Sequence, residues 1–121
     1  MFSITSARYF LYLEPTDMRK SFDGLCGLVT SQLGQNPMSG DLYIFVNKPR
    51  NRIKMLRWEP GGFVLFYKRL EKGTFHLPKQ AAESAKNQVL DYSQLVMIIN
   101  GISLENARKR KRFYQQNDVE K

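Results

Sequence analysis

The sequence has almost none of the residues that build disulfides and metal sites. It contains one cysteine, Cys26, and one histidine, His76, among 121 residues. A single thiol excludes an internal disulfide, and the two residues are too few for a zinc site, which takes about four such ligands. We therefore expect a reduced, cytoplasmic protein with no structural metal and no cofactor.

Catalytic motifs and membrane segments are lacking as well. There is no glycine-rich phosphate loop and no Ser/His/Asp or Cys/His catalytic set. Strand-transfer chemistry needs clustered carboxylates to hold metal ions, and helix capping explains the nearest group (Glu14, Asp17, Asp23) better. No apolar run approaches the roughly 20 residues that cross a bilayer. The first fifteen residues do not look like a signal peptide. We expect neither an enzyme nor a membrane protein.

Negative charge is scarce and positive charge is abundant. Nineteen Lys and Arg oppose eleven Asp and Glu, so the net charge is +8 at pH 7. A field of this sign attracts polyanions by steering them and by releasing their counterions. Nucleic acid, or else an anionic membrane surface, is therefore the expected partner class. The alternative is a protein that is basic without having such a partner.

Short apolar segments between turn residues predict the secondary structure. We predict strands at 8–13, 41–47, 52–59 and 62–70, and helices at 17–33 and 92–99. Thr16 or Asp17 can cap the first helix, and Gly34 can end it. Asp91 and Gln94 form a capping-box pattern at the start of the second helix.

Strands this short with so little sequence between them are typical of an antiparallel meander. We predict a single α+β domain over residues 1–103, with a sheet of about four antiparallel strands packed by the two helices. Residues 78–88 are polar, which suggests a linker or a weak helix. Residues 104–121 form a basic tail that is either helical or disordered. The oligomeric state is left open.

Many of the cations lie in one part of the chain. Residues 48–72 contain eight Lys and Arg but only two Glu. They gather at strand ends and in the loop after 41–47, where a hairpin with a basic tip can contact a phosphate backbone. The alternative is a set of solvated edge charges that prevents strand aggregation. Along 52–59 the alternation of apolar and charged residues breaks, which predicts a bulge or an end that leaves the core.

The candidate nucleic-acid-binding residues fall into three groups. The strands and their loops contribute Lys48, Arg50, Arg52, Lys54, Arg57, Lys68 and Arg69. At the predicted start of the first helix, Arg19 and Lys20 can hold a phosphate together with free N–H groups, and the alternative is an Arg19–Asp23 ion pair. The tail contributes a run that binds phosphates without sequence specificity or forms a solvated helix face: Arg108, Lys109, Arg110, Lys111 and Arg112.

Several longer motifs resemble one family. The stretches YLEPTDMRKSFDGLCGLV (12–29) and 36–75, which includes SGDLYIF, NRIKMLRW and YKRLEKG, resemble the short accessory proteins of IS66-family bacterial insertion sequences. These proteins are called TnpB or second-reading-frame products. The resemblance extends more loosely to about residue 102. It implies a role in transposition beside a separate, larger transposase that carries the catalytic carboxylates, and it makes DNA the natural polyanion.

The residues and the resemblance together leave several functions open. The first is an accessory protein that binds DNA, including the ends of the element, through its basic surface. The second is an adaptor that contacts the transposase and binds DNA weakly or not at all. A third is binding to single-stranded DNA or RNA. The resemblance supplies no catalytic residue.

Overall fold

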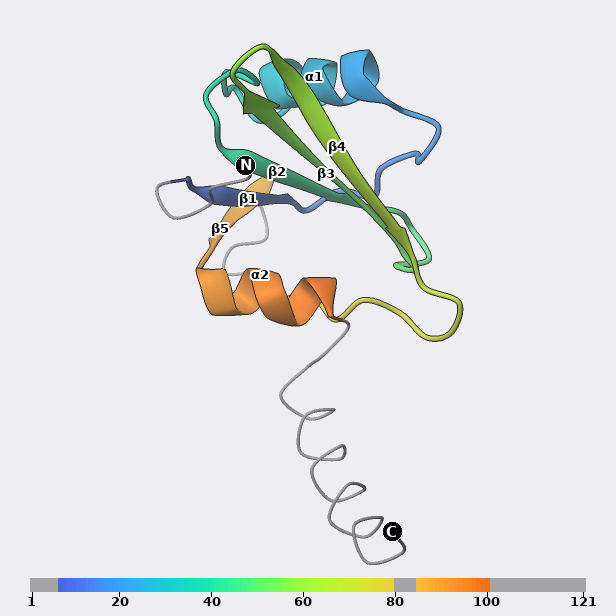
Figure 1. The fold of residues 1–121 in the computed structure, drawn as a ribbon. Coiled ribbons are helices and arrows are strands. Elements are labelled where there is room, and N and C mark those ends of the chain that lie inside the picture. Colours follow the sequence, from blue (N-terminus) through green and yellow to red (C-terminus); the bar gives the residue numbers. More distant parts are fainter. Residues whose placement is uncertain (1–6, 80–84, 101–121) are drawn as a thin grey trace, which may run out of the picture.

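The computed structural model describes residues 7–79 and 85–100. These residues form one small α+β domain in which a sheet lies between two helices (Figure 1). In chain order the elements are β1 (Tyr9–Tyr12), α1 (Phe22–Ser31), β2 (Leu42–Val46), β3 (Arg52–Glu59), β4 (Gly62–Arg69), β5 (Asn87–Leu90) and α2 (Tyr92–Ile99). The strands are arranged across the sheet in the order β4-β3-β2-β1-β5.

The sheet is mixed, so the predicted antiparallel meander of about four strands is wrong. β1 runs parallel to β2, and the three other pairings are antiparallel. A parallel pair needs a long crossover connection, and α1 with its flanking loops supplies one here. The predicted α+β class and the two helices are confirmed.

β5 is the strand that the sequence did not predict. It begins at the end of the polar segment that we interpreted as a linker or a weak helix. It pairs antiparallel with β1, with Tyr12 opposite Asn87 and Tyr9 opposite Leu90. Only one of its four residues, Leu90, is buried. A strand with one buried side chain has too little apolar periodicity to be recognised locally.

Both faces of the sheet are covered, one by each helix (Figure 1). Against α1, Leu25 and Val29 pack on Phe10 and Tyr43, whose rings stack 5.6 Å apart. Against α2, the buried cluster contains Leu95 and Ile98 together with alternate residues of β1, β2 and β3. The alternation along β3 breaks because both of its faces are buried. We predicted a bulge or an end that leaves the core. The bulge is wrong, since β3 pairs with β4 without interruption from Arg52 to Glu59, whereas the last two residues of β3 are only partly buried.

The start of α1 also differs from the prediction. Its N-cap is Ser21, which makes no side-chain capping bond, rather than Thr16 or Asp17. The residues before it form a loop fastened to the sheet by Lys54, whose Nζ donates to the carbonyl oxygens of Met18 (2.8 Å) and Lys20 (2.7 Å). These contacts between distant residues outweigh the local helical pattern.

The ends of the helices otherwise follow their local signals. Gly34, with φ of +62°, follows α1 in the left-handed conformation that favours glycine. At the start of α2, the carboxylate of Asp91 accepts from the N–H of Gln94 at 2.8 Å, and the Gln94 side chain accepts from the N–H of Asp91 at 3.0 Å. The predicted capping box is therefore confirmed.

Candidate nucleic-acid interface

Exposed and half-buried cations meet at one end of the sheet. β2 runs toward this end, β3 starts there, and β4 finishes there, so that Arg52 and Arg69 are opposite each other in the β3–β4 ladder. The segment after β1 reaches the same end because β1 is parallel to β2, and the N–H of Thr16 donates to the carbonyl of Val46 at 2.9 Å. We call this surface the basic end. It comprises Arg19, Lys48, Arg50, Arg52 and Arg69.

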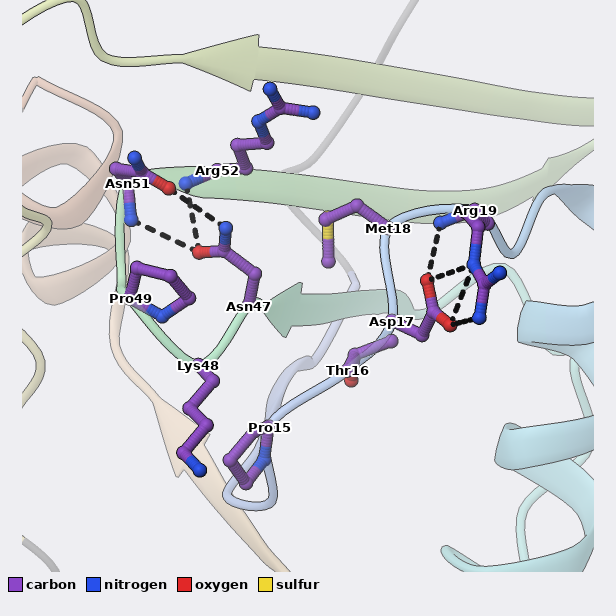
Figure 2. Close-up of a pocket in the computed structure, with 10 residues that line it drawn as sticks. All are labelled: Pro15, Thr16, Asp17, Met18, Arg19, Asn47, Lys48, Pro49, Asn51 and Arg52. Atoms are coloured by element: carbon purple, nitrogen blue, oxygen red, sulfur yellow. Dashed lines mark hydrogen bonds and ion pairs between the residues drawn. The ribbon is translucent and has the colours of Figure 1, made fainter.

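An open hollow of about 580 Å³ lies at the basic end (Figure 2). One wall is formed by residues 15–19, and the other by 47–49, 51 and 52. Asn47 shapes the second wall, because its Oδ1 accepts from the N–H groups of Asn51 and Arg52, each at 3.0 Å. The fold thus places Arg19, Lys48 and Arg52 around one space, although Arg19 comes from a distant part of the chain.

Two neighbouring hollows extend this surface. One of about 110 Å³ is bordered by Lys48 and Arg50. Another of about 350 Å³ is bordered by Arg52, Arg69 and Tyr67. Because Lys48 and Arg52 each line the main hollow as well, the five cations of the basic end border a continuous stretch of surface.

Ion pairs neutralise part of this charge. Arg19 lies 2.7 Å from Asp17, and Arg69 lies 2.8 Å from Glu71. Hydrogen bonds from the side chain and then the backbone N–H of Arg19 lower the pKa of Asp17 to about 2. The alternative Arg19–Asp23 pair does not form, because Arg19 precedes α1 and bonds to Asp17 instead.

The remaining cations of the basic end keep their charge available. Lys48, Arg50 and Arg52 form no ion pair with any residue in the described ranges. Arg52 donates to the hydroxyl of Tyr67 at 3.2 Å, a neutral partner that leaves the guanidinium charge in place. These three residues are therefore the strongest candidates for contact with an anion.

Three other predicted binding residues hold the fold together. Lys54 is only 6% exposed and fastens the loop before α1. Arg57 is 9% exposed, and its Nε donates to the carbonyl of Gly40 at 3.0 Å. Lys68 donates to the carbonyl of Ile99 at 2.6 Å, at the C-terminal end of α2. The charged groups of these three residues bond to backbone carbonyls, so they are not free to contact a phosphate.

Two further groups of predicted residues lie elsewhere. Lys20 is exposed but lines none of the three hollows, and its carbonyl accepts from Lys54. The basic run of the tail lies outside the described residues: Arg108, Lys109, Arg110, Lys111 and Arg112.

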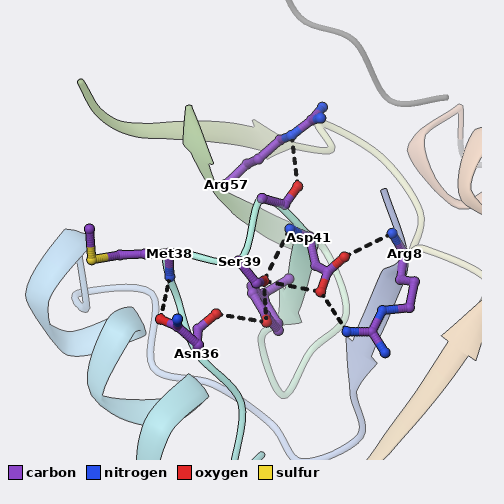
Figure 3. Close-up of polar contacts among 8 residues, drawn as sticks. Arg8, Asn36, Met38, Ser39, Asp41 and Arg57 are labelled. Carbon is purple, nitrogen blue, oxygen red and sulfur yellow. Dashed lines mark hydrogen bonds and ion pairs between the residues drawn. The ribbon is translucent and has the colours of Figure 1, made fainter. Parts of the chain in front are cut away.

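The SGDLYIF motif forms a polar network at the opposite end of the sheet (Figure 3). Asp41 accepts from the backbone N–H and the guanidinium of Arg8, each at 3.0 Å, and from the hydroxyl of Ser39 at 3.0 Å. The hydroxyl of Tyr43 lies 3.0 Å from that of Ser39 and donates to the carbonyl of Asn36 at 3.1 Å. The motif therefore ties the loop before β2 to β1.

We predict that Asp41→Asn lowers the free energy of unfolding by about 1–2 kcal/mol at neutral pH, because the hydrogen bonds from Arg8 lose their ionic acceptor. Burial raises the pKa of Asp41, but the bonds from Arg8 and Ser39 together outweigh it and leave this pKa below its ordinary 3.8. The stabilisation is therefore present above pH 3.8 and is lost as the pH falls through the lower folded-state pKa. Urea denaturation of both proteins at neutral pH and at pH values below 3.8 measures this loss. A stability difference between the variant and the wild-type protein that does not change with pH would contradict the prediction.

A second prediction concerns Arg50, the one non-glycine residue with positive φ (59°) among those described. The left-handed conformation costs such a residue about 1–2 kcal/mol, and glycine avoids most of this cost. We expect Arg50→Gly to raise the free energy of unfolding by up to about 1 kcal/mol while weakening DNA binding several-fold. Denaturation and anisotropy titrations on the same preparation measure both. Unchanged DNA affinity would remove Arg50 from the interface.

Two features are absent from the part of the chain that the structure describes. No helix in residues 7–79 and 85–100 is long and apolar enough to cross a membrane. Within the same ranges, no three His, Cys, Asp or Glu side chains are grouped so that they could hold a metal ion.

Comparison with known proteins connects the sequence of this chain to a family. The family model described as IS66 Orf2 like protein matches residues 7–109. Two curated relatives, the uncharacterized proteins y4jC and y4hO, come from Sinorhizobium fredii. The first is 35% identical over 71 residues, covering 59% of this chain and 61% of the relative. The second is 29% identical over 105 residues, covering 86% and 88%.

No solved structure matches this chain. The family assignment therefore rests on sequence, and the matched range spans both helices and all five strands of the described domain. The chain belongs to the IS66 Orf2 like protein family, the accessory proteins of IS66 insertion sequences.

Proposed function

We propose that this protein assists transposition by binding DNA at the basic end of its sheet, with the ends of the element as the candidate target. The observation that carries the proposal is that Arg19, Lys48 and Arg52, from two separate segments of the chain, line the same open hollow. Arg50 and Arg69 extend the same surface. The basic tail, residues 104–121, adds affinity without adding specificity.

The chemistry of the main hollow suits phosphate groups of a duplex. Guanidinium groups donate paired hydrogen bonds to phosphate oxygens, and lysine supplies a mobile positive charge. No aromatic side chain lines the main hollow, so it offers no aromatic ring on which an unpaired base can stack. Contacts of this kind position a protein on DNA and carry little sequence information.

A titration of labelled duplex by fluorescence anisotropy at several salt concentrations tests the proposal. Each neutralised phosphate makes the slope of log affinity against log salt more negative by about 0.9. Three to five contacts at the basic end therefore contribute about −2.7 to −4.5, and contacts from the tail steepen the slope further. Failure to bind any duplex near physiological salt, or binding that salt does not weaken, would refute it. Tighter binding to the matching single strand would favour the single-strand alternative.

An adaptor for the transposase is the second candidate. It is favoured by the finding that Lys54, Arg57 and Lys68 bond to backbone carbonyls, which leaves fewer cations for DNA. A pull-down of the element's transposase that survives nuclease treatment would support it. So would charge reversal at Arg50 and Arg52 that abolishes transposition without changing DNA affinity.

A further inference from the structure

β4 forms an open edge of the sheet. It pairs only with β3, and no other described strand lies on its outer side. Three large side chains on this strand are exposed: Val64 (42%), Phe66 (42%) and Tyr67 (47%). Proteins usually shorten, charge or cover such an edge, because its unpaired backbone groups form a template for another strand. The centre of β4 carries no charge, so an added strand is not repelled there.

The register of the β3–β4 hairpin shows which backbone groups are available. Glu59 and Gly62 face each other across a two-residue turn, and the N–H of Leu70 donates to the carbonyl of Asn51 at 2.8 Å. Backbone groups alternate sides along an antiparallel strand, so the even-numbered residues of β4 bond toward β3. The N–H and C=O groups of Phe63, Leu65 and Tyr67 therefore point to the open edge.

We propose that two copies of this protein pair through β4, antiparallel and about a two-fold axis at Leu65. In this register Leu65 faces Leu65 of the second copy, and Phe63 faces its Tyr67. The three outward-pointing residues of each strand meet those of the other, and about six backbone hydrogen bonds form. An isologous contact of this kind closes on itself and makes a dimer rather than a fibre.

The side chains of β4 are compatible with this arrangement. On the α2 face, Val64 of each copy lies opposite Phe66 of the other, and these pairs extend the apolar lining of a groove of about 420 Å³ that includes Met55 and Ile99. Lys68 of each copy lies opposite Gly62 of the other, at the end of the hairpin that carries Glu59. The ammonium of Lys68 keeps its bond to the carbonyl of Ile99 in its own copy, and the two Lys68 side chains stay about 20 Å apart along the joined strands.

Two neighbouring registers are less favourable. An axis at Phe66 would place Lys68 opposite Val64 of the second copy, and an axis at Tyr67 would place Lys68 opposite Phe66. Both put a charged side chain against an apolar one and remove the Val64–Phe66 pairs. A register in which odd-numbered residues face even-numbered ones would not align the outward-pointing backbone groups.

The antiparallel arrangement puts the two basic ends at opposite ends of the joined sheet. Their mutual repulsion is weak at this separation, because physiological salt screens charges beyond about 8 Å. A dimer could then hold two DNA segments at once. That consequence rests on the proposed DNA binding, whereas the pairing itself does not.

Sedimentation equilibrium of the full chain without DNA tests the pairing. We expect the 14.1 kDa chain to dimerise with rising concentration over about 1–300 µM. Val64→Lys and Phe66→Lys should each weaken the dimer more than about tenfold, because each change places a charge at two symmetric positions. Val89→Lys is the matched control: Val89 is 58% exposed on β5, the opposite edge strand, and should leave the dimer unchanged.

Mixing two variants tests the register. Val64→Glu and Phe66→Lys chains should each be largely monomeric alone but dimerise when mixed, because the new carboxylate and ammonium then face each other. Failure of the mixture to dimerise would overturn the register at Leu65. A wild-type chain that stays monomeric would overturn the pairing altogether. If the transposase then bound through β4, the edge would be assigned to that protein instead.

Discussion

Lys54→Met is expected to lower the free energy of unfolding by about 3 kcal/mol. The Lys54 ammonium donates to two carbonyl oxygens, those of Met18 at 2.8 Å and Lys20 at 2.7 Å, and lies 4.6 Å from the centre of the Tyr67 ring. Methionine keeps most of the volume of the side chain but leaves both carbonyls without their donor. The loop before α1 should loosen, and with it one wall of the main hollow.

Chemical denaturation measures this loss, and Arg52→Met is its matched control. Arg52 lies two residues before Lys54 on the same face of β3, and its hydrogen bond to Tyr67 is exposed. Removing that cation should change the free energy of unfolding by less than about 1 kcal/mol. Equal losses in the two variants would show that the buried position of Lys54 is not the cause.

Charge reversal at the basic end should have the largest effect on DNA binding. We expect the double variant Lys48→Glu with Arg52→Glu to bind duplex at least about 100-fold more weakly than the wild-type protein at moderate salt, and the salt slope to fall by about 1.8 in magnitude. Both residues line the main hollow, and neither forms an ion pair with a described residue. The fold should be retained, because neither charged group is buried.

The matched control for that variant is Lys79→Glu with Lys86→Glu. It makes the same change in net charge at exposed positions that line none of the three hollows. Anisotropy titrations should show only a small loss of affinity through the general field of the protein. If both double variants lost affinity equally, net charge and not the basic end would govern binding.

The sequence predicted the elements whose signals are local. β3 and α2 were located residue for residue, because turn residues bound the first and a capping box starts the second. The parallel pairing of β1 with β2 could not be predicted, since it depends on how α1 crosses the sheet. β5 was missed because it becomes a strand by pairing with β1 rather than by its own composition.

The candidate site was only partly predictable, because part of it depends on contacts between distant segments of the chain. The sequence predicted that cations gather at strand ends, and the β3–β4 register, which places Arg52 opposite Arg69, agrees with that prediction. That Arg19 joins Lys48 around one hollow depends on the tertiary fold. The sequence does indicate that Lys54 and Arg57 are buried. Both lie among apolar residues in a strand whose alternation of apolar and charged residues breaks, as expected when both faces of the strand are covered.

The most direct test of the central claim is a titration of isotope-labelled protein with a short DNA duplex, followed by the chemical shifts of its backbone amides. If DNA binds at the basic end, the largest changes should occur in residues 16–19, 47, 48 and 50–52, since Pro15 and Pro49 have no amide proton. The amides of β5 and α2 should change little. Changes confined to those latter elements, or no changes at duplex concentrations well above about 100 µM, would contradict DNA binding at the basic end.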